Sequence, residues 1–214
     1  GSFTAHLVCR VSRPSRAVFE GPQLGLVNQW AELRGERMTE ILDQIAVPLQ
    51  YWSALVDLNP ISHRYSLELI HLALELAYRV LQPMKHCLGC PRPASYAPGI
   101  QPIIRPRRFA AFPSGHATEA FLVARLLAFL AGHRQGAPAH AVLETQLQGL
   151  AARIANNRVV AGVHFHLDSV SGRLLAESLA EYLIQRCDPD QAGWLPRRYD
   201  GALLKPNDAE AQTS

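Results

Sequence analysis

The stretch "FPSGHATEAF", residues 112–121, joins a turn to the start of a helix. The proline, serine and glycine in its first half are poor residues for a helix interior and favour a turn. From Ala117 onward, apolar residues recur at the three- and four-residue spacing of a helix. Ser114 stands where an N-cap belongs, and the free N–H groups of a helix start can hold an anion. Taken alone, the stretch favours a plain helix cap beside a surface histidine, His116, so partners elsewhere must decide its role.

Composition predicts one domain with a buried core, because 48% of the 214 residues are hydrophobic and only 18% are charged. The Gly1-Ser2 start without methionine resembles a cloning scar. We expect residues 1–35 to be an N-terminal extension, 36–187 to be the helical domain and 188–214 to be a loosely packed tail. The net charge of +3 is too small to predict nucleic-acid binding.

The apolar segments are too interrupted to predict a membrane span, which needs roughly 20 apolar residues. Charged residues divide the segments 40–57, 66–82 and 117–132. The pair Cys87 and Cys90 lacks the further ligands that a structural zinc site needs, so the four cysteines are interpreted as free thiols in a reducing compartment. We therefore expect a soluble protein, and the cytoplasm is favoured over the periplasm.

Apolar periodicity predicts helices over residues 36–57, 62–84, 115–132, 138–156 and 165–186. Pro48 should kink or divide the first helix, and Pro83 should end the second. The proline-rich residues 86–113 form a long irregular loop, which is usually functional at this length. Residues 159–165 are the one strand-like run. The pattern predicts an all-α bundle whose site is formed by helix ends and this loop.

A second chemical stretch, "NNRVVAGVHFHLDSVSG" at 156–172, contains Arg158, His164 and Asp168. On a helix, the i, i+4 spacing of His164 and Asp168 puts both on one face. A carboxylate bound to one imidazole nitrogen leaves the other nitrogen to act as a nucleophile or ligand. The alternative is a helical His–Asp pair without a chemical role.

Further cations precede the first motif. The stretch "KHCLGCPRP" at 85–93 contains Lys85 and Arg92 at the junction of helix and loop. Together with Arg158, a helix start and two histidines, they are what a tetrahedral oxyanion requires. The run "RPRR" at 105–108 is interpreted as a solvated loop, although its position before residue 112 also suits the rim of a site.

The three stretches together resemble the tripartite motif of the type-2 phosphatidic acid phosphatases and vanadium-dependent haloperoxidases. They read K-x6-R-P, P-S-G-H and N-R-x5-H-x3-D, in this order, and the resemblance covers residues 36–186. Asn157 departs from the family, which usually has serine there, but it stands outside the charged set. The resemblance implies a role for each matching residue: Lys85, Arg92 and Arg158 bind the oxyanion, Ser114 and Gly115 add hydrogen bonds, His116 is the general acid, His164 is the nucleophile or vanadate ligand, and Asp168 orients His164.

The resemblance implies a soluble phosphatase that hydrolyses phosphate monoesters through a phosphohistidine, with a phosphorylated small molecule or lipid as substrate. The alternative is a haloperoxidase, in which vanadate would be the cofactor; the phosphatase would need neither cofactor nor metal. A non-catalytic helical module that binds anions is a third possibility, which leaves His116 and Asp168 without a purpose. His166 is interpreted as a rim or structural residue, because i and i+2 point apart on a helix. Homo-oligomerisation stays open.

Overall fold

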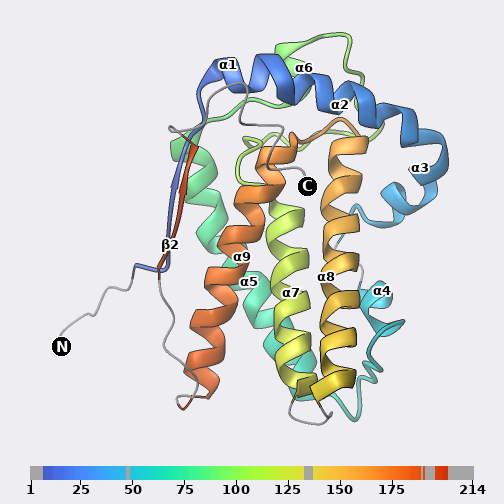
Figure 1. Cartoon of the computed structure of the whole chain (residues 1–214), viewed down its shortest axis with the longest axis vertical. Coiled ribbons are helices and arrows are strands. Elements are labelled where there is room, and N and C mark those ends of the chain that lie inside the picture. The colour runs from blue at the N-terminus through green and yellow to red at the C-terminus, as the bar shows by residue number, and fades with distance from the viewer. Residues whose placement is uncertain (1–6, 47–48, 133–136, 189, 191–195, 202–214) are drawn as a thin grey trace.

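The computed structural model describes residues 7–46, 49–132, 137–188, 190 and 196–201. Its long helices lie side by side: α5 (Arg64–Leu88), α7 (Gly115–Gly132), α8 (Ala137–Val160) and α9 (His166–Cys187) (Figure 1). This arrangement confirms the expected all-α bundle. The chain direction alternates through α7, α8 and α9, so the ends of α5 and α8 meet the starts of α7 and α9 at one end of the bundle.

Helix α7 is the centre of the bundle and contacts α5, α8 and α9. It begins and ends where the sequence predicted. Apolar residues surround its whole circumference, and Phe121, Leu122, Leu126 and Leu127 are all buried. A helix that is apolar on every side is stable only when other elements cover every side. The composition of α7 therefore accounts for its central place.

Helix α5 continues through Pro83 to Leu88, so the prediction that Pro83 ends this helix was wrong. Proline removes the hydrogen bond to the carbonyl four residues earlier, which belongs to Arg79. Arg79 lies on the exposed face of α5, where water can replace the lost N–H. The helix ends instead at Gly89, whose φ of 56° is a left-handed conformation that favours glycine. Lys85 therefore lies on the last turn of a helix.

Helix α8 extends beyond its predicted end at 156, so Arg158 lies on its last turn. No strand forms over the described residues 159–165, although their composition resembles one. The chain reverses there through Gly162, which has a φ of 76°. Val159 and Val163 are buried in the core instead of pairing in a sheet.

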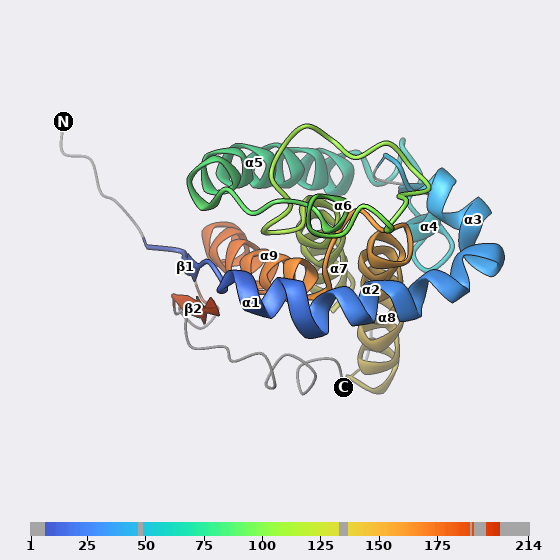
Figure 2. The same ribbon diagram turned by 90° about the horizontal axis from the view of Figure 1, so that it is seen from above.

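Residues 16–43 form a nearly continuous run of short helical segments across one end of the bundle (Figure 2). Phe19 and Val27 in this run are fully buried, and the Gln23 side chain accepts a hydrogen bond of 3.0 Å from the N–H of Leu167 at the start of α9. Much of the expected extension 1–35 is thus packed against the bundle. The segments are α1 (Arg16–Val18), η1 (Phe19–Gln23), α2 (Leu24–Trp30), η2 (Ala31–Leu33) and α3 (Arg34–Asp43).

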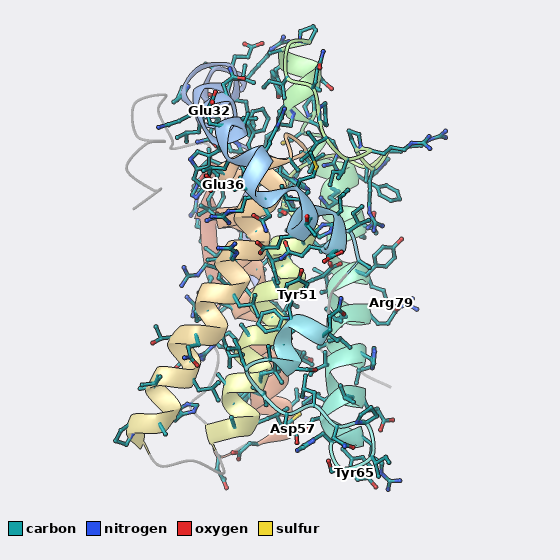
Figure 3. The ribbon with its side chains drawn as sticks, turned by 90° about the vertical axis from the view of Figure 1, so that its right-hand side faces the viewer. Glu32, Glu36, Tyr51, Asp57, Tyr65 and Arg79 are labelled. Carbon is teal, nitrogen blue, oxygen red and sulfur yellow. The ribbon has the colours of Figure 1, made fainter. Side chains whose placement is uncertain are left out.

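The predicted helix 36–57 is two helices, α3 and α4 (Leu49–Ser53), and Pro48 lies outside the described residues. Both helices lie between α5 and α8, on the side of α7 that faces the viewer in Figure 3. The Tyr51 hydroxyl of α4 donates a hydrogen bond of 3.3 Å to the Asp43 carboxylate at the end of α3. Trp52 of α4 is fully buried in the main core.

Two short strands, β1 (Cys9–Ser12) and β2 (Arg197–Asp200), pair in parallel beside α9. The sequence pattern did not predict this pair. Tyr199 is buried, and the centre of its ring lies 5.7 Å from that of Phe112. The expectation of a loose tail over 188–214 is therefore wrong for residues 197–200, while residues 202–214 lie outside the described part. Burial of the Tyr199 side chain holds β2 against the rest of the molecule.

The four cysteines are free, as expected. Cys87 is exposed, whereas Cys90 is buried and its carbonyl accepts a hydrogen bond of 2.8 Å from the N–H of Ala111. Burial raises the pKa of the Cys90 thiol to about 12. A thiol with a raised pKa is inert, so Cys90 packs in the core under the proline-rich loop.

Candidate active site

The helix ends that meet at one end of the bundle enclose a cavity of about 360 Å³. Two of the predicted site residues, Ser114 and Asp168, are buried behind its wall. The other six line it: Lys85, Arg92, Gly115, His116, Arg158 and His164. Folding thus brings together residues from α5, α7, α8, the proline-rich loop and the turn before α9.

His164 and Asp168 form a close pair, but they do not share a helix face as the sequence suggested. Helix α9 begins at His166, so His164 precedes it and Asp168 lies in its first turn. Asp168 Oδ2 accepts two hydrogen bonds of 2.9 Å, one from His164 Nδ1–H and one from the N–H of the cap residue Phe165. The helix start therefore orients the carboxylate, and the carboxylate orients the imidazole.

The second ring nitrogen of His164 faces the cavity. Burial, with Arg92, Lys85 and Arg158 nearby, lowers the pKa of His164 well below its usual 6.5. The imidazole is therefore neutral, with its proton on Nδ1 toward Asp168. Its Nε2 lone pair lies 3.3 Å from Nη1 of Arg92, which is a cation that would draw an anion to this nitrogen.

Arg158 is fully buried at the end of α8 and still has donors to offer. Its Nη2 donates to the carbonyl of Ile41 on α3 at 2.9 Å. Its Nε and Nη1 have no hydrogen-bond partner among the described residues. A buried donor without a partner is costly, and a bound oxyanion would satisfy both. Burial lowers the pKa of Arg158 to about 10, so the side chain stays charged at neutral pH.

Lys85 differs from the expected oxyanion ligand. Its Nζ donates to the carbonyls of Ala110 at 3.0 Å and Ala111 at 2.9 Å, and also to that of Pro113. An ammonium group has three N–H donors, so all are used in holding the end of the loop before α7. Burial lowers the pKa of Lys85 to about 8, although Asp168 opposes the shift. In this structure Lys85 fixes the loop, and its charge acts at the cavity through space.

His116 lies in the first turn of α7 and is held by the turn that follows α3. Its Nε2 donates to the carbonyl of Ile45 at 3.2 Å, which leaves Nδ1 as the other ring nitrogen. Burial, Arg158 and His164 lower the pKa of His116 to about 3. The imidazole is therefore neutral while the cavity is empty. A dianion bound between Arg158 and His116 would offset the positive charge and raise this pKa.

Ser114 caps α7, as predicted. Its Oγ accepts from the N–H of Ala117 at 3.4 Å, and its own N–H donates to the carbonyl of Asp168 at 2.8 Å. Gly115 lies on the cavity wall. The starts of α7 and α9 are thus joined directly, which places the helix start of α7 beside His164. This is the geometry of an anion site at a helix N-terminus.

Sequence reasoning missed several residues on the cavity wall. Glu119, one turn after His116 on α7, lines the cavity, and burial raises its pKa to about 7. Its i+3 spacing from His116 was a signal that could have found it. Arg105 and Arg107 also line the cavity although both side chains are exposed, so this part of the loop is solvated and lies at the rim of the site, which is the alternative that the sequence left open.

His166 is not on the cavity wall. Its ring stands edge-on to that of Trp30, with 5.6 Å between the ring centres. Burial lowers its pKa. His166 thus packs the α2 segment against the start of α9. This contact agrees with the interpretation of His166 as a structural residue. Within the described residues, no three His, Cys, Asp or Glu side chains gather in a way that could hold a metal ion.

Asn157, where the sequence departs from the usual motif, is fully buried between α8 and α3. Its amide donates to the Gln44 side chain at 2.9 Å, and its carbonyl oxygen accepts from Arg37 at 3.2 Å. These two hydrogen bonds join α8 to residues of α3 and its end. A serine side chain is too short to reach both Gln44 and Arg37. The sequence treated Asn157 as standing outside the charged set; the structure makes it the link that joins α3 to the site.

Comparison with known proteins agrees with this fold. A search of curated proteins found no match. A crystal structure described as the first transmembrane PAP2-type phosphatidylglycerolphosphate phosphatase from Bacillus subtilis is similar, with a TM-score of 0.63 and 21% identity over 83% of this chain and 89% of that chain. At this identity the likeness shows the fold. None of the helices that the structure describes here is both long and apolar enough to cross a bilayer.

The family comparison covers the part of the chain that builds the cavity. The model of the PAP2 superfamily matches residues 68–188, more than half of the chain. The matched range contains all eight motif residues, from Lys85 to Asp168. It is preceded by α3 and the turn after it, whose carbonyls hold Arg158 and His116. The chain therefore belongs to the PAP2 superfamily.

Proposed function

We propose that the protein hydrolyses phosphate monoesters and that His164 forms a phosphohistidine during the reaction. The observation that carries the proposal is the neutral imidazole of His164, whose Nδ1–H is bound by Asp168 while Nε2 faces a cation-lined cavity. Phosphoryl transfer needs positioning and charge neutralisation more than covalent chemistry. The family and the fold neighbour, a phosphatase by its description, support the same activity.

The substrate phosphoryl group would lie between Arg92, Arg158 and the start of α7. The two unpartnered donors of Arg158 can bind phosphoryl oxygens. Arg92 and Gly115, the first residue of α7, lie on the same wall, although Nη1 of Arg92 already donates to the carbonyl of Val163 at 2.6 Å. These donors sit in a buried site, where they stabilise the charge that builds up on the equatorial oxygens.

In the first step, Nε2 of His164 attacks phosphorus, and the bond from phosphorus to the ester oxygen breaks. The electron pair goes to the leaving oxygen, which takes a proton from His116. In the second step, the oxygen of water attacks the phosphorus of the phosphohistidine and gives a proton to His116. The bond from phosphorus to Nε2 breaks, its electron pair returns to Nε2 of His164, and orthophosphate leaves. His116 must gain its proton on Nδ1 once the dianion is bound, because Nε2–H is held by Ile45.

The leaving group is apolar in this proposal. Besides the charged groups, the cavity is lined by apolar side chains, among them Ile45, Leu81, Ile104, Phe109 and Val163. An apolar wall of this kind stabilises a bound ligand by burying its carbon atoms, which contributes roughly 25 cal/mol of binding free energy per Å² of apolar surface. We therefore expect alkyl monophosphates to be better substrates than phosphorylated sugars.

The direct test traps the phosphoenzyme. Wild-type protein is mixed with an alkyl phosphate labelled at phosphorus, quenched in alkali and digested, since phosphohistidine survives alkali. We expect label on the peptide that contains His164 and none in His164→Ala, which should have no turnover. His166→Ala is the matched control and should keep most of the label and most of the turnover. Label on another residue, or equal loss in the two variants, would contradict the proposal.

A further inference from the structure

One strip of helix α7 faces the cavity. Of residues 111–124, only Gly115, His116 and Glu119 are not buried, and all three line the cavity. The residues between and after them pack into the bundle. Residues three apart on a helix have their Cβ atoms roughly 5–6 Å apart, and a long side chain leans back toward the start of its helix. The side chain of Glu119 therefore extends along the cavity wall toward His116.

The carboxyl group of Glu119 has no partner and no task in the two steps of the proposed hydrolysis. Among the described residues, its side chain makes no hydrogen bond or ion pair, and it is the one carboxyl group on the cavity wall. An unpaired carboxyl group in an otherwise apolar stretch of helix is costly. Burial raises the pKa of Glu119 to about 7, while Arg107 and Lys85 oppose the shift. Glu119 can therefore both give and take a proton near neutral pH.

The general acid His116 needs a proton that its surroundings disfavour. Its Nε2–H is held by the carbonyl of Ile45, so the proton for the leaving oxygen has to be carried on Nδ1. Burial, Arg158 and His164 lower the pKa of His116 to about 3. At neutral pH the imidazole is therefore neutral before the substrate binds, and a nearby acid has to charge it.

The other polar groups on the wall are poor sources of this proton. The three N–H donors of Lys85 are occupied by carbonyls of the loop. Arginine does not lose its proton in proteins, which excludes the four arginines that line the cavity. His164 keeps its one ring proton on Nδ1, in the hydrogen bond to Asp168. A phenol such as that of Tyr78 is a far weaker acid than a carboxyl group. Glu119 is the acid that remains.

Resting on the proposed function, we infer that Glu119 supplies the proton with which His116 protonates the leaving oxygen. As the phosphate dianion binds, the carboxylic acid gives its proton to Nδ1 of His116, which leaves a carboxylate beside an imidazolium. The bond from phosphorus to the ester oxygen then breaks, and that oxygen takes the electron pair and the Nδ1 proton. In the second step, His116 receives a proton from the attacking water and returns it to Glu119. Glu119 acts through His116 and touches no atom of the substrate, so it is a positioning residue.

A double-mutant cycle tests this relay. Glu119→Gln keeps the size of the side chain but has no acidic proton. At about pH 6.5, we expect its kcat to fall about 10- to 100-fold with octyl phosphate and much less with a nitrophenyl phosphate, whose leaving group needs no proton. In the His116→Ala background, Glu119→Gln should cause no further loss with octyl phosphate, because the group that it serves is absent. Glu68→Gln, at an exposed glutamate of α5, is the matched control and should behave as wild type.

The pH dependence provides a readout that a purely structural role would not change. In the wild type, the ratio of kcat for octyl phosphate to kcat for the nitrophenyl ester should fall as the pH rises through about 7, since ionised Glu119 has no proton to give. Lys85, Arg107, Arg158 and His164 face the same cavity and act on both esters, so their effects cancel in the ratio. In Glu119→Gln the ratio should fall at a lower pH, because His116 alone then binds the proton. Glu119→Asp keeps the acid and should restore part of the ratio.

Other results would overturn the inference. Equal losses with the two esters in Glu119→Gln would mean that the carboxyl group supports the phosphoryl site or the packing of α7. A further loss of the same size in the His116→Ala background would mean that Glu119 does not act through His116. An unchanged pH profile of the ratio in Glu119→Gln would assign the titration to another group. These three outcomes leave the proposed function intact, whereas no wild-type turnover of either ester would count against the proposed function and remove the inference with it.

Discussion

The side-chain amides of Asn157 and Gln44 meet in a buried hydrogen bond of 2.9 Å between α8 and α3. This contact holds the end of α3 against α8, together with the ion pair of Arg153 and Glu40. From that end, the carbonyl of Ile41 accepts from Arg158 and the carbonyl of Ile45 accepts from His116. The end of α3 and the turn after it, which precede the matched family region, thus orient two side chains of the proposed active site.

Breaking this amide pair should lower stability and activity together. Gln44→Ala and Asn157→Ala each leave a buried partner without its hydrogen bond, which costs about 1–3 kcal/mol in the free energy of unfolding. The double variant should lose less than the sum, because both changes remove one interaction. Denaturant unfolding and kcat/KM on an alkyl phosphate measure the cycle. Gln50→Ala, at an exposed glutamine of α4, is the control. Additive losses would show that the two amides act separately.

Gly172→Ala should push α9 away from the start of α7. A Cβ at Gly172 would meet the carbonyl oxygen of Ser114 at 2.7 Å and the Cβ of Ala117 at 3.0 Å. Both belong to or lie next to the backbone, so neither can move easily, and we expect a loss of about 1–3 kcal/mol with reduced activity. Gly149→Ala is the matched control, since nothing lies within 4 Å of its Cβ. It should be neutral or stabilising by up to about 1 kcal/mol. Equal stability of the two variants would contradict the packing argument.

Activity should fall as the pH rises through about 8, because the pKa of Lys85 is lowered to that value. Deprotonation removes one of the three donors that hold the loop and a charge near the cavity. The contribution of Lys85 to stability has the opposite sign: between its folded pKa of about 8 and the usual lysine pKa of 10.5, the unfolded chain binds more protons, so this contribution rises with pH.

A profile of kcat/KM against pH tests this, alongside thermal unfolding over the same range. Lys85→Arg keeps the charge at all these pH values and should lose the fall near pH 8, whatever its absolute rate. A fall near pH 8 that persists in Lys85→Arg would assign the titration to another group.

His116→Ala should affect alkyl and aryl esters differently. Removing a general acid typically lowers the rate by about 10²–10⁴. An alkoxide needs a proton to leave, whereas a nitrophenolate does not, so the loss should be large for octyl phosphate and small for a nitrophenyl phosphate. The ratio of kcat between the two substrates is the measurement. Equal losses would mean that His116 binds the phosphoryl group and does not protonate the leaving oxygen.

Orthovanadate should inhibit the phosphatase competitively. Vanadate takes the five-coordinate geometry of a phosphoryl group in flight, and mimics of a transition state bind far more tightly than substrates. Arg158→Ala should weaken this inhibition, because it removes the two donors that are free in the cavity. Phosphate release and bromide oxidation by peroxide are measured during one vanadate titration. Rapid bromide oxidation that saturates near one vanadate per chain would favour a haloperoxidase instead.

Much of the fold could be predicted from local pattern. The span of α7 matches its apolar run, because a helix buried on every side needs continuous apolar sequence. The end of α5 could not be predicted from Pro83, since the tolerance of a proline depends on whether water reaches the freed carbonyl of Arg79. The β1–β2 pair could not be predicted either. Its strands are four residues each and lie 188 positions apart in register.

The sequence by itself determined the helical class and the set of charged and imidazole groups, because helical periodicity and motif spacing are local properties of the chain. Only the tertiary structure decided how these groups work. It turned Lys85 toward the loop, oriented Asp168 from the first turn of α9, and placed Arg105 and Arg107 on the cavity wall. It also brought the carbonyls of Ile41 and Ile45, at and after the end of α3, to the site. The physical reason is that hydrogen-bond partners and burial depend on what packs nearby, and the packing of segments more than a hundred residues apart is not encoded in any one stretch.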